Sequence, residues 1–398
     1  MPSLKNSIRL LLVISLLGDF AAAFTYPVFP LYLQDLRLGV VFIGLADAVA
    51  EAAMGSLQLV SGWFSDRFGN RRRFVQAGLG LTALAFVGYG WVVQPALLFV
   101  ARVGRSLGEG IRSAPHYAYL ANLQRQRAAP ATAGLKYGQV FGWNKAAEKL
   151  GVGLGMLAAI GLVGGVSVLY RELFLLATLP LALALVCTLF LRREPSTGRP
   201  VLSTLRWREI RSLWQTASPG LRRALRFGAV YALVRSSDVI LLLRARQLAT
   251  NDTQLLFTYF GFQLVLVAMA LLAGRLTDRL GPQKALAIGF GSFVLLYGSL
   301  MLPLPPGALW LVFVVHGIHV AFTVTVLRIW IVREAPPSQH GTALGLYGLL
   351  RSVGILPANL LAGGLWVELG ESWAFGWSAV GGLLLIAALV LSMRPRRA

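Results

Sequence analysis

The 398-residue sequence has one cysteine, Cys187, and little charge, since only 13 % of its residues are Asp, Glu, Lys or Arg. Soluble domains carry about 25 % charged residues, so this chain lacks the polar side chains that would cover several soluble domains. A single cysteine excludes an internal disulfide and a cysteine metal cluster. The sequence also lacks the zinc motif H-E-x-x-H and the phosphate-binding loop G-x4-G-K-[ST]. These absences argue against zinc-dependent and ATP-dependent enzymes and against a disulfide-stabilised secreted domain.

Hydrophobic residues make up 56 % of the chain and form long runs. A helix of about twenty apolar residues crosses the hydrocarbon core of a bilayer. We therefore expect an all-α, polytopic membrane protein with twelve transmembrane helices. The first apolar run is interrupted by Asp19 and continues to Leu33, which indicates a retained span rather than a cleaved signal peptide. The predicted spans lie near residues 8–33, 40–64, 73–93, 96–120, 134–162, 166–191, 224–248, 255–276, 285–303, 308–332, 342–364 and 373–393.

Positive charge is distributed unevenly over the predicted loops. The chain has 37 Lys and Arg residues against 16 Asp and Glu, and the basic residues concentrate in alternate loops. The other loops, together with the ends of the spans beside them, contain only Arg37, Arg171, Arg244 and Arg246. Because cytoplasmic loops carry the basic excess, we expect a multi-pass protein of the cytoplasmic (inner) membrane with both termini in the cytoplasm. This topology accounts for the net charge of +21, so nucleic acid is not an expected partner.

The longest predicted loop, residues 192–223, divides the chain into halves of six helices, residues 1–191 and 224–398. Within it, the stretch Leu205–Trp214 alternates basic and apolar residues. That pattern is typical of an amphipathic helix at the inner headgroups. A solvated linker that only follows the charge rule would look the same, so both interpretations stay open.

A short motif, G-x3-D-R-x-G, follows the second and the eighth predicted helix. Glycine permits a tight turn at the end of a helix, and an aspartate there can accept hydrogen bonds from backbone amides and arginine. One copy alone would be a helix cap, but two copies at equivalent positions indicate an internal duplication and a loop that gates a conformational change. The gating-loop residues are Gly62, Asp66, Arg67, Gly69 and Arg71 in the first copy, and Gly274, Asp278, Arg279 and Gly281 in the second.

Glycines on the fifth and eleventh predicted helices form a second repeat. Glycines four residues apart let membrane helices approach closely. In this alignment Glu148 falls opposite Arg351, so the halves differ where a charge lies. The matched positions are Gly138, Gly142 and Gly151 against Gly341, Gly345 and Gly354.

This arrangement resembles the major facilitator superfamily over nearly the whole chain, because the doubled G-x3-D-R-x-G loop is the signature of that family. A finer resemblance is to a prokaryotic efflux-like subgroup similar to archaeal MJ1317-type transporters. It is carried by residues 108–115, 236–245 and 341–345. The resemblance implies two pseudo-symmetric six-helix bundles, a transport function without a cofactor, and a central cavity lined by the first, fourth, seventh and tenth helices.

Ionisable side chains inside the predicted spans are candidate functional groups, because an unpaired charge in lipid is costly. The candidates for proton coupling are Asp19, Asp47, Glu51 and Glu109. The candidates for the substrate cavity are Tyr26, Arg112, His116, Arg235, Asp238 and His319. Arg351 and Glu148 are candidate interdomain charges, and the resemblance places Arg351 near Asp47 or Glu51.

Several of these groups also have a structural interpretation. Glu109 and Arg112, three residues apart, can form an ion pair within one helix. Arg351 can make a gating or assembly contact with an acid that never binds a proton. His316 and His319 without a third ligand are weak evidence for a metal, so no metal site is predicted.

These observations favour a secondary active transporter that works by alternating access. The predicted spans hold more basic than acidic residues, which favours an amphipathic or anionic small molecule as substrate. The subgroup resemblance implies efflux by proton antiport, by a monomer surrounded by lipid. The alternatives are a transporter of a metal ion or a lipid-like substrate, and a membrane receptor that does not transport.

Overall fold

A computed structural model describes residues 3–25, 40–91, 94–127, 136–165, 170–192, 194, 207–235, 241, 244–245, 248, 252–305 and 307–393. These residues form helices joined by short turns, and none of them lies in a β-strand. The all-α prediction is therefore confirmed for the part of the chain that the structure describes.

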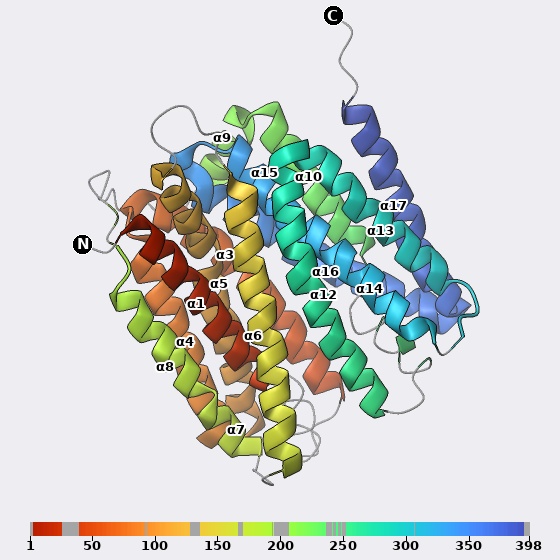
Figure 1. Cartoon of the computed structure of the whole chain (residues 1–398), viewed down its shortest axis with the longest axis horizontal. Coiled ribbons are helices and arrows are strands. Elements are labelled where there is room, and N and C mark those ends of the chain that lie inside the picture. Colours follow the sequence, from red (N-terminus) through yellow and green to blue (C-terminus); the bar gives the residue numbers. More distant parts are fainter. Residues whose placement is uncertain are drawn as a thin grey trace, which may run out of the picture. The chain divides into compact units, whose positions relative to one another are not determined.

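The helices follow the predicted apolar runs closely (Figure 1). In the first half they are α1 (Leu4–Thr25), α3 (Val40–Phe68), α4 (Arg71–Trp91), α5 (Pro95–Arg127), α6 (Tyr137–Gly165), α7 (Tyr170–Leu176) and α8 (Thr178–Leu189). Then come α9 (Trp207–Thr216), α10 (Pro219–Val234), α12 (Asp252–Leu280), α13 (Pro282–Leu300), α14 (Ala308–Val320), a π-helical turn η1 (Ala321–Thr325) and α15 (Val326–Glu334). A 3₁₀ turn η2 (Pro337–Gln339), α16 (His340–Leu369) and α17 (Glu371–Met393) complete the described chain.

Eight stretches of the described chain are long and apolar enough to cross a membrane. They are residues 4–23, 71–91, 172–189, 257–280, 282–300, 308–334, 337–369 and 371–393. Helix α5 has 33 residues but is not one of them, and it carries Arg105, Glu109 and Arg112 in its middle. The described part of the chain thus contains eight candidate spans, and the total of twelve stays a prediction.

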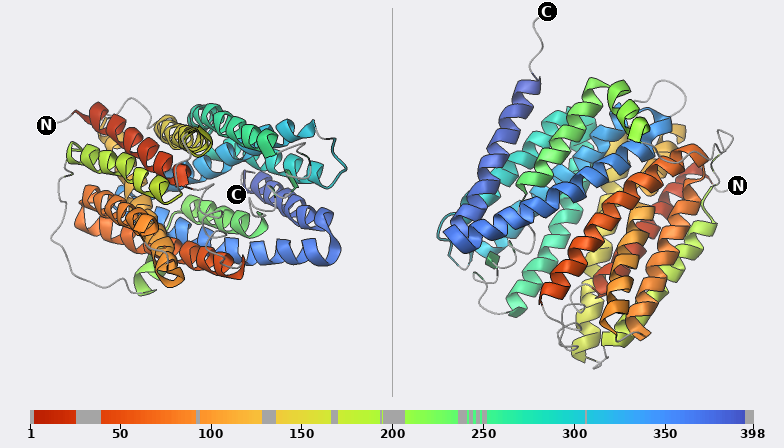
Figure 2. Two further views of the ribbon diagram at one scale, coloured as in Figure 1. Left: turned by 90° about the horizontal axis from the view of Figure 1, so that it is seen from below. Right: turned by 180° about the vertical axis from the view of Figure 1, so that it is seen from behind.

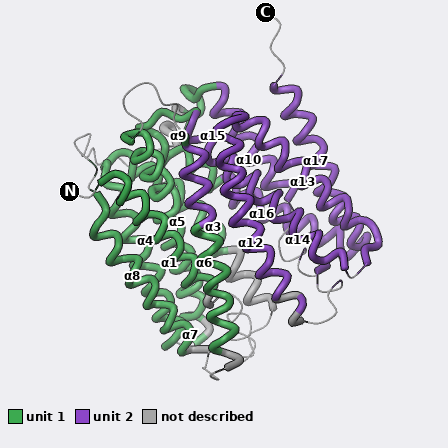
Figure 3. The backbone as a smooth tube through the Cα atoms, in the orientation of Figure 1, with its two compact units in different colours: residues 1–136, 147–218, 334–349 green, residues 137–146, 219–333, 350–398 purple. Residues whose placement is uncertain are grey.

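The chain forms two compact units (Figure 3). Unit 1 comprises residues 1–136, 147–218 and 334–349, and unit 2 comprises residues 137–146, 219–333 and 350–398. Two helices contribute to both, because α6 begins in unit 2 and α16 begins in unit 1. Each unit thus contains the first turns of a helix whose remainder belongs to the other.

In unit 1 the helices lie alongside one another (Figures 1 and 2). Helix α5 packs against α3 and α4, and α8 packs against α1 and α4. Gly78 of α4 and Gly108 of α5 face each other, since a Cβ on either would meet the backbone carbonyl of the other. Tyr89 and Phe174, both buried, pack with their ring centroids 5.2 Å apart. Helix α5, which carries Glu109 and Arg112, is therefore held firmly inside the unit.

In unit 2, α13 packs against α14 and α17, and α12 packs against α14. Its interior is aromatic, with Tyr231 and Phe293 in edge contact at 5.7 Å. Gly289 of α13 lies directly against the backbone of η1, because a Cβ there would meet Phe322. This contact places the irregular turn of the tenth predicted span in the middle of the unit.

The central linker contains the predicted short helix. Helix α9 runs from Trp207 to Thr216, close to the predicted stretch Leu205–Trp214. Along it, Ile210 and Trp214 are partly buried, whereas Arg211 and Gln215 are exposed. Residues 195–206 of the linker lie outside the described residues. The described part of the linker thus contains a helix, whereas an amphipathic role at the lipid headgroups stays a prediction.

Candidate functional site

Both copies of the repeated motif form a sharp turn between two helices. Gly69 and Gly281 have positive φ angles of 62° and 85°, a conformation that residues with a side chain disfavour. The amide of Gly69 donates to the carbonyl of Ser65, and the amide of Gly281 donates to that of Thr277, both at 3.1 Å. The glycine therefore ends its helix in each copy, as the sequence predicts.

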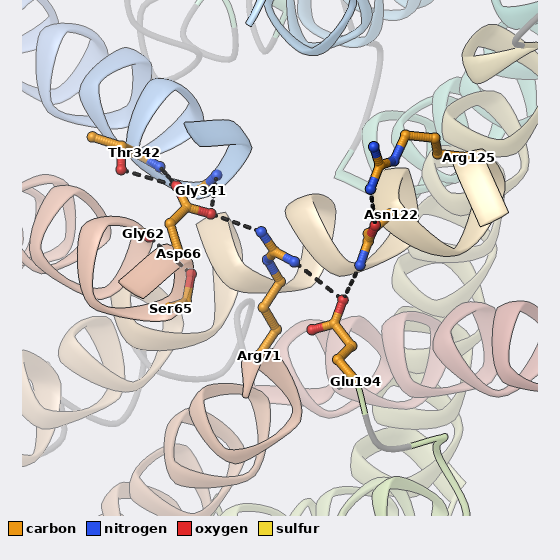
Figure 4. Close-up of polar contacts among 9 residues, drawn as sticks. All are labelled: Gly62, Ser65, Asp66, Arg71, Asn122, Arg125, Glu194, Gly341 and Thr342. Carbon is orange, nitrogen blue, oxygen red and sulfur yellow. Dashed lines mark hydrogen bonds and ion pairs between the residues drawn. The ribbon is translucent and has the colours of Figure 1, made fainter. Parts of the chain in front are cut away.

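Asp66 binds the first turn of a helix that is distant in the sequence (Figure 4). Its Oδ1 accepts the amide of Gly341 at 3.0 Å, and its Oδ2 accepts the amide and the hydroxyl of Thr342 at 2.7 and 2.9 Å. The first amides of a helix have no partner within the helix, and the helix dipole favours an anion there. Arg71 Nη2 donates to the same carboxylate at 2.8 Å. These four residues form what we name the Asp66 latch.

Asp278 likewise binds the first turn of a distant helix, in unit 2. It accepts the amides of Gly138 and Gln139, the first turn of α6, at 2.9 and 2.8 Å. Arg333, near the end of α15, donates to it at 2.6 Å. These residues form the Asp278 latch. The internal duplication read from the sequence is thus a duplication of one physical device, a carboxylate that caps a helix from outside.

The two latches differ in the origin of their arginine. Arg71 belongs to the motif loop itself, and its Nη1 donates to Glu194 at 3.1 Å. Asn122 of α5 donates to the same oxygen of Glu194 at 2.6 Å (Figure 4). The Glu194 side chain is only 3 % exposed. The start of the central linker is therefore tied to the Asp66 latch, whereas the Asp278 latch takes Arg333 from a neighbouring helix.

The arginines that directly follow the two aspartates, Arg67 and Arg279, differ in their surroundings. The guanidinium of Arg67 lies over the ring of Trp63, 4.3 Å from its centroid. Arg279 is exposed. In both copies it is thus the aspartate that accepts hydrogen bonds from the first turn of the distant helix.

Glycines of the two repeats allow this approach. In unit 1 a Cβ on Gly341 would meet the carbonyl oxygen of Gly62, and in unit 2 a Cβ on Gly138 would meet that of Gly274. These pairs hold equivalent positions in the two halves. The predicted close approach at these glycines is confirmed, and it brings each aspartate within hydrogen-bonding distance of its helix.

Replacing Gly274 with alanine is expected to destabilise the protein by about 1–3 kcal/mol, because the added methyl would meet rigid backbone. The measurement is the thermal unfolding midpoint in detergent. Gly298→Ala is the matched control, since a Cβ there has nothing within 4 Å. Equal midpoints for the two variants would show that the contact at Gly274 is loose.

A charged cluster lies between α1 and α5 of unit 1. Arg112 Nη2 donates to both carboxylate oxygens of Glu109, at 2.9 and 3.1 Å, and lies 3.6 Å from Oδ1 of Asp19. The side chains of Arg112, Asp19 and Glu109 are 9 %, 23 % and 42 % exposed. One buried cation is thus shared by two acids on different helices, and we name these three residues the Arg112 cluster.

Further polar groups surround the Arg112 cluster. His116 Nε2 and Ser15 Oγ are 3.0 Å apart, and the Tyr117 hydroxyl donates to Glu148 at 2.5 Å. The carboxylate of Glu148 is close enough to interact electrostatically with Asp19. Predicted cavity and coupling residues on two helices of unit 1, α1 and α5, therefore lie in one neighbourhood, and Glu148 of α6 belongs to it as well.

His319 lies inside unit 2 and is fully buried. Its Nδ1 is 3.2 Å from the carbonyl oxygen of Gly289, and its Nε2 is 2.9 Å from the hydroxyl of Tyr231. The ring of His316 stacks on Phe262 at 4.8 Å. No group of three His, Cys, Asp or Glu side chains among the described residues is placed to hold a metal ion. In this conformation His319 thus contacts the helices of its own unit, and its place in the cavity stays a prediction.

Some predicted site residues cannot be compared with the structure. Tyr26 and Asp238 lie outside the described residues, as does the side chain of Asp47. Glu51 lies on α3 in unit 1, and Arg351 lies on α16 in unit 2. The predicted pairing of Arg351 with Asp47 or Glu51 therefore stays a prediction.

Arg235, another predicted cavity residue, directly follows the last residue of α10 in unit 2 and is partly buried. Its amide donates to the carbonyl of Tyr231 at 3.0 Å, so the backbone at Arg235 continues the hydrogen bonding of the helix. Whether its side chain meets a substrate stays a prediction.

A five-residue match to the hydrolase motif G-x-S-x-G spans Gly104–Gly108. In hydrolases that serine occupies a sharp turn between a strand and a helix. Here Ser106 lies within α5, is buried, and accepts a hydrogen bond from Arg102 at 3.1 Å. The match thus carries no hydrolase chemistry.

Sequence reasoning missed Glu194, Asn122 and Arg333. Glu194 had a visible signal, because it is an acidic residue directly after two arginines. Asn122 and Arg333 had none, since each becomes a partner only when distant helices pack together. The latches were therefore predicted at their aspartates but not in their full composition.

Comparisons with known proteins agree with this architecture. The family model described as Major Facilitator Superfamily matches residues 11–356 and, in a second match, residues 227–398. The MFS-type transporter MJ1317 of Methanocaldococcus jannaschii is 24 % identical over 401 residues, covering 98 % of this chain and 94 % of the relative.

Two further proteins are similar. The puromycin resistance protein of Streptomyces alboniger is 31 % identical over 157 residues, which cover 38 % of this chain and 30 % of that protein. The crystal structure of the human organic anion transporter MFSD10 has a TM-score of 0.78 at 18 % identity, covering 98 % of this chain and 100 % of that chain.

Proposed function

This chain belongs to the Major Facilitator Superfamily and is a multi-pass membrane transporter, and from that premise we propose that it couples the export of a small molecule to proton entry. Two six-helix bundles, twelve helices in all, alternate the access of a central site between the two sides of the membrane. The chain acts as a monomer in the cytoplasmic membrane, with both termini in the cytoplasm.

The observation that carries proton coupling is the Arg112 cluster. Two acids share one cation, so the trio has one negative charge in excess when both acids are ionised. Glu148 adds to this excess, whereas Lys149 near Asp19 and Arg105 near Glu109 reduce it. In a low-dielectric environment that excess is costly and favours the binding of a proton or of a cationic group. The side chain of Glu109 is 42 % exposed and that of Arg112 only 9 %. A proton can therefore reach the acids while the arginine stays in place.

Proton binding at Asp19 would weaken the electrostatic attraction between Arg112 and α1. Asp19 is on α1 and Arg112 is on α5, so their attraction joins the two helices. A neutral Asp19 would leave the arginine to Glu109, which lies on the same helix as Arg112. Protonation thus changes a contact between helices, which is what coupling to a conformational change requires.

An amphipathic or anionic substrate is supported by the excess of basic over acidic residues in the predicted spans. Export is supported by the partial similarity to a puromycin resistance protein. Puromycin and a fluorescent organic carboxylate are therefore the first compounds to test.

Replacing Asp19 with asparagine is expected to abolish substrate-driven proton movement and to leave folded protein in the membrane, because the variant removes the titrating acid while keeping its shape. The measurement uses proteoliposomes that contain a pH-sensitive dye and receive a gradient of puromycin or of the carboxylate. Glu368→Gln, at an exposed acid of α16, is the control and should behave like the parent. Unchanged proton flux in Asp19→Asn and in Glu109→Gln would disprove coupling at this cluster.

A further inference from the structure

Gly18, the one glycine of α1, lies directly beneath the guanidinium of Arg112. A Cβ built on Gly18 would be 3.3 Å from Cζ and 3.5 Å from Nη2 of Arg112, and nearer still to Nη1. Arg112 therefore reaches across from α5 and rests on the backbone of α1, next to Asp19. A residue with any side chain at position 18 would occupy that space.

We propose that Gly18 is the positioning residue of the Arg112 cluster: its missing side chain leaves the space in which the Arg112 guanidinium lies between Asp19 and Glu109. This inference deepens the proposed function and rests on it, since it concerns the same two acids. Gly18 acts only through Arg112.

The other close-packed glycines that face α1 have a different neighbour. Added Cβ atoms on Gly151 and Gly155 of α6 would meet the backbone carbonyls of Leu16 and Phe20. Those two glycines let two helices approach. At Gly18 the neighbour is the far end of a flexible side chain, so a methyl group there would move the guanidinium and not the helices. Glycine is also among the poorest helix formers, so helix stability does not explain its presence in the middle of α1.

The position of the guanidinium decides how the two acids share it. Nη2 is 2.9 Å from Glu109 but 3.6 Å from Asp19. The contact with Asp19 is thus a pure charge attraction, which weakens as the distance grows. Glu109 and Arg112 lie on the same helix and can stay paired when the arginine moves away from α1. Displacement of the guanidinium would therefore affect Asp19 more than Glu109.

The test uses the purified full-length protein and dicyclohexylcarbodiimide, which modifies protonated carboxyl groups. Mass spectrometry gives the modified fraction of Asp19 and of Glu109 at each pH. In Gly18→Ala we expect the half-modification point of Asp19 to rise by roughly one pH unit, because a more distant cation favours the protonated acid. The profile of Glu109 should stay unchanged. Gly161→Ala, where a Cβ has nothing within 4 Å, should match the parent at both acids.

Repeating Gly18→Ala in a protein that also carries Arg112→Gln shows whether the shift in the Asp19 profile depends on Arg112. Glutamine is shorter than arginine, so in Arg112→Gln the added methyl finds no guanidinium, and Gly18→Ala should then produce no further shift. An unchanged Asp19 profile in folded Gly18→Ala would overturn the proposal, and so would an equal shift in the glutamine background. If Gly18→Ala does not fold, folding of the double variant supports the proposal, and failure of both variants overturns it.

The result for Gly18→Ala can be distinguished from the result of the proton-flux experiment that tests the proposed function. Suppose that proton-coupled flux is absent while the Asp19 profile still shifts in Gly18→Ala. That result would remove the coupling role of the Arg112 cluster and keep the positioning role of Gly18. Flux lost in Asp19→Asn with no shift in Gly18→Ala would do the reverse.

Discussion

Arg112→Gln is expected to lower the free energy of unfolding by about 3 kcal/mol, because it leaves Asp19 and Glu109 without the cation they share. This value is at the lower end for a broken buried ion pair, since the Glu109 side chain is 42 % exposed and keeps part of its hydration. The measurement is chemical unfolding in detergent micelles. The loss should be smaller at acid pH, because protonated acids no longer need a cation.

Arg127→Gln is the matched control for this prediction. Arg127 is the last residue of the same helix and is exposed, so its replacement should change stability by less than about 0.5 kcal/mol. Adding Asp19→Asn to Arg112→Gln should restore part of the stability, because it removes one of the uncompensated charges. If Arg112→Gln destabilises no more than Arg127→Gln, the cluster is too well hydrated for the arginine to matter.

The sequence predicts those parts of the structure that depend on local spacing. Apolar runs predict the helices, and a glycine three residues after Asp66 or Asp278 predicts the turn, which the positive φ angles confirm. The spacing of Glu109 and Arg112 predicts their pairing within one helix. Each of these features requires only neighbouring residues and the geometry of a helix.

Features that join distant segments could not be predicted in the same way. Glu194 meets Arg71 across 123 positions of sequence, and nothing near either residue indicates the other. The proposed role of Gly18 is still harder to predict, because it depends on the absence of a side chain. Only the packing of Arg112 against α1 shows why that absence matters. Duplication within the chain helps to predict the Asp66 and Asp278 latches, because each copy supports the other. It does not help to predict Glu194, because the described residues of the Asp278 latch include no acid in the equivalent role.

Asp66→Asn is expected to open the first turn of α16, raising amide hydrogen exchange at Gly341 and Thr342 by roughly 100-fold. The carboxylate accepts both amides, whereas a carboxamide offers one oxygen and turns its NH2 group toward other donors. A loss of about 2.7 kcal/mol in a charge-assisted hydrogen-bond set corresponds to that change in exchange. Hydrogen exchange followed by mass spectrometry measures it directly.

Each half of the molecule provides the control for the other. Asp278→Asn should raise exchange at Gly138 and Gln139 but not at Gly341 and Thr342, because Asp278 accepts only the first pair. Uniform changes at both helix starts would mean global loosening, not release of one latch.

Glu194→Gln extends this test to the linker. Glu194 contacts Arg71 and not the amides themselves, so its effect on the first turn of α16 should be weaker than that of Asp66→Asn, roughly tenfold. The start of α6 should not respond, because the Asp278 latch takes its arginine from α15. A response confined to the start of α16 would make the central linker part of the Asp66 latch, and through it part of the gating that we expect of the repeated motif. No response would reduce Glu194 to a counter-ion for Arg71 alone.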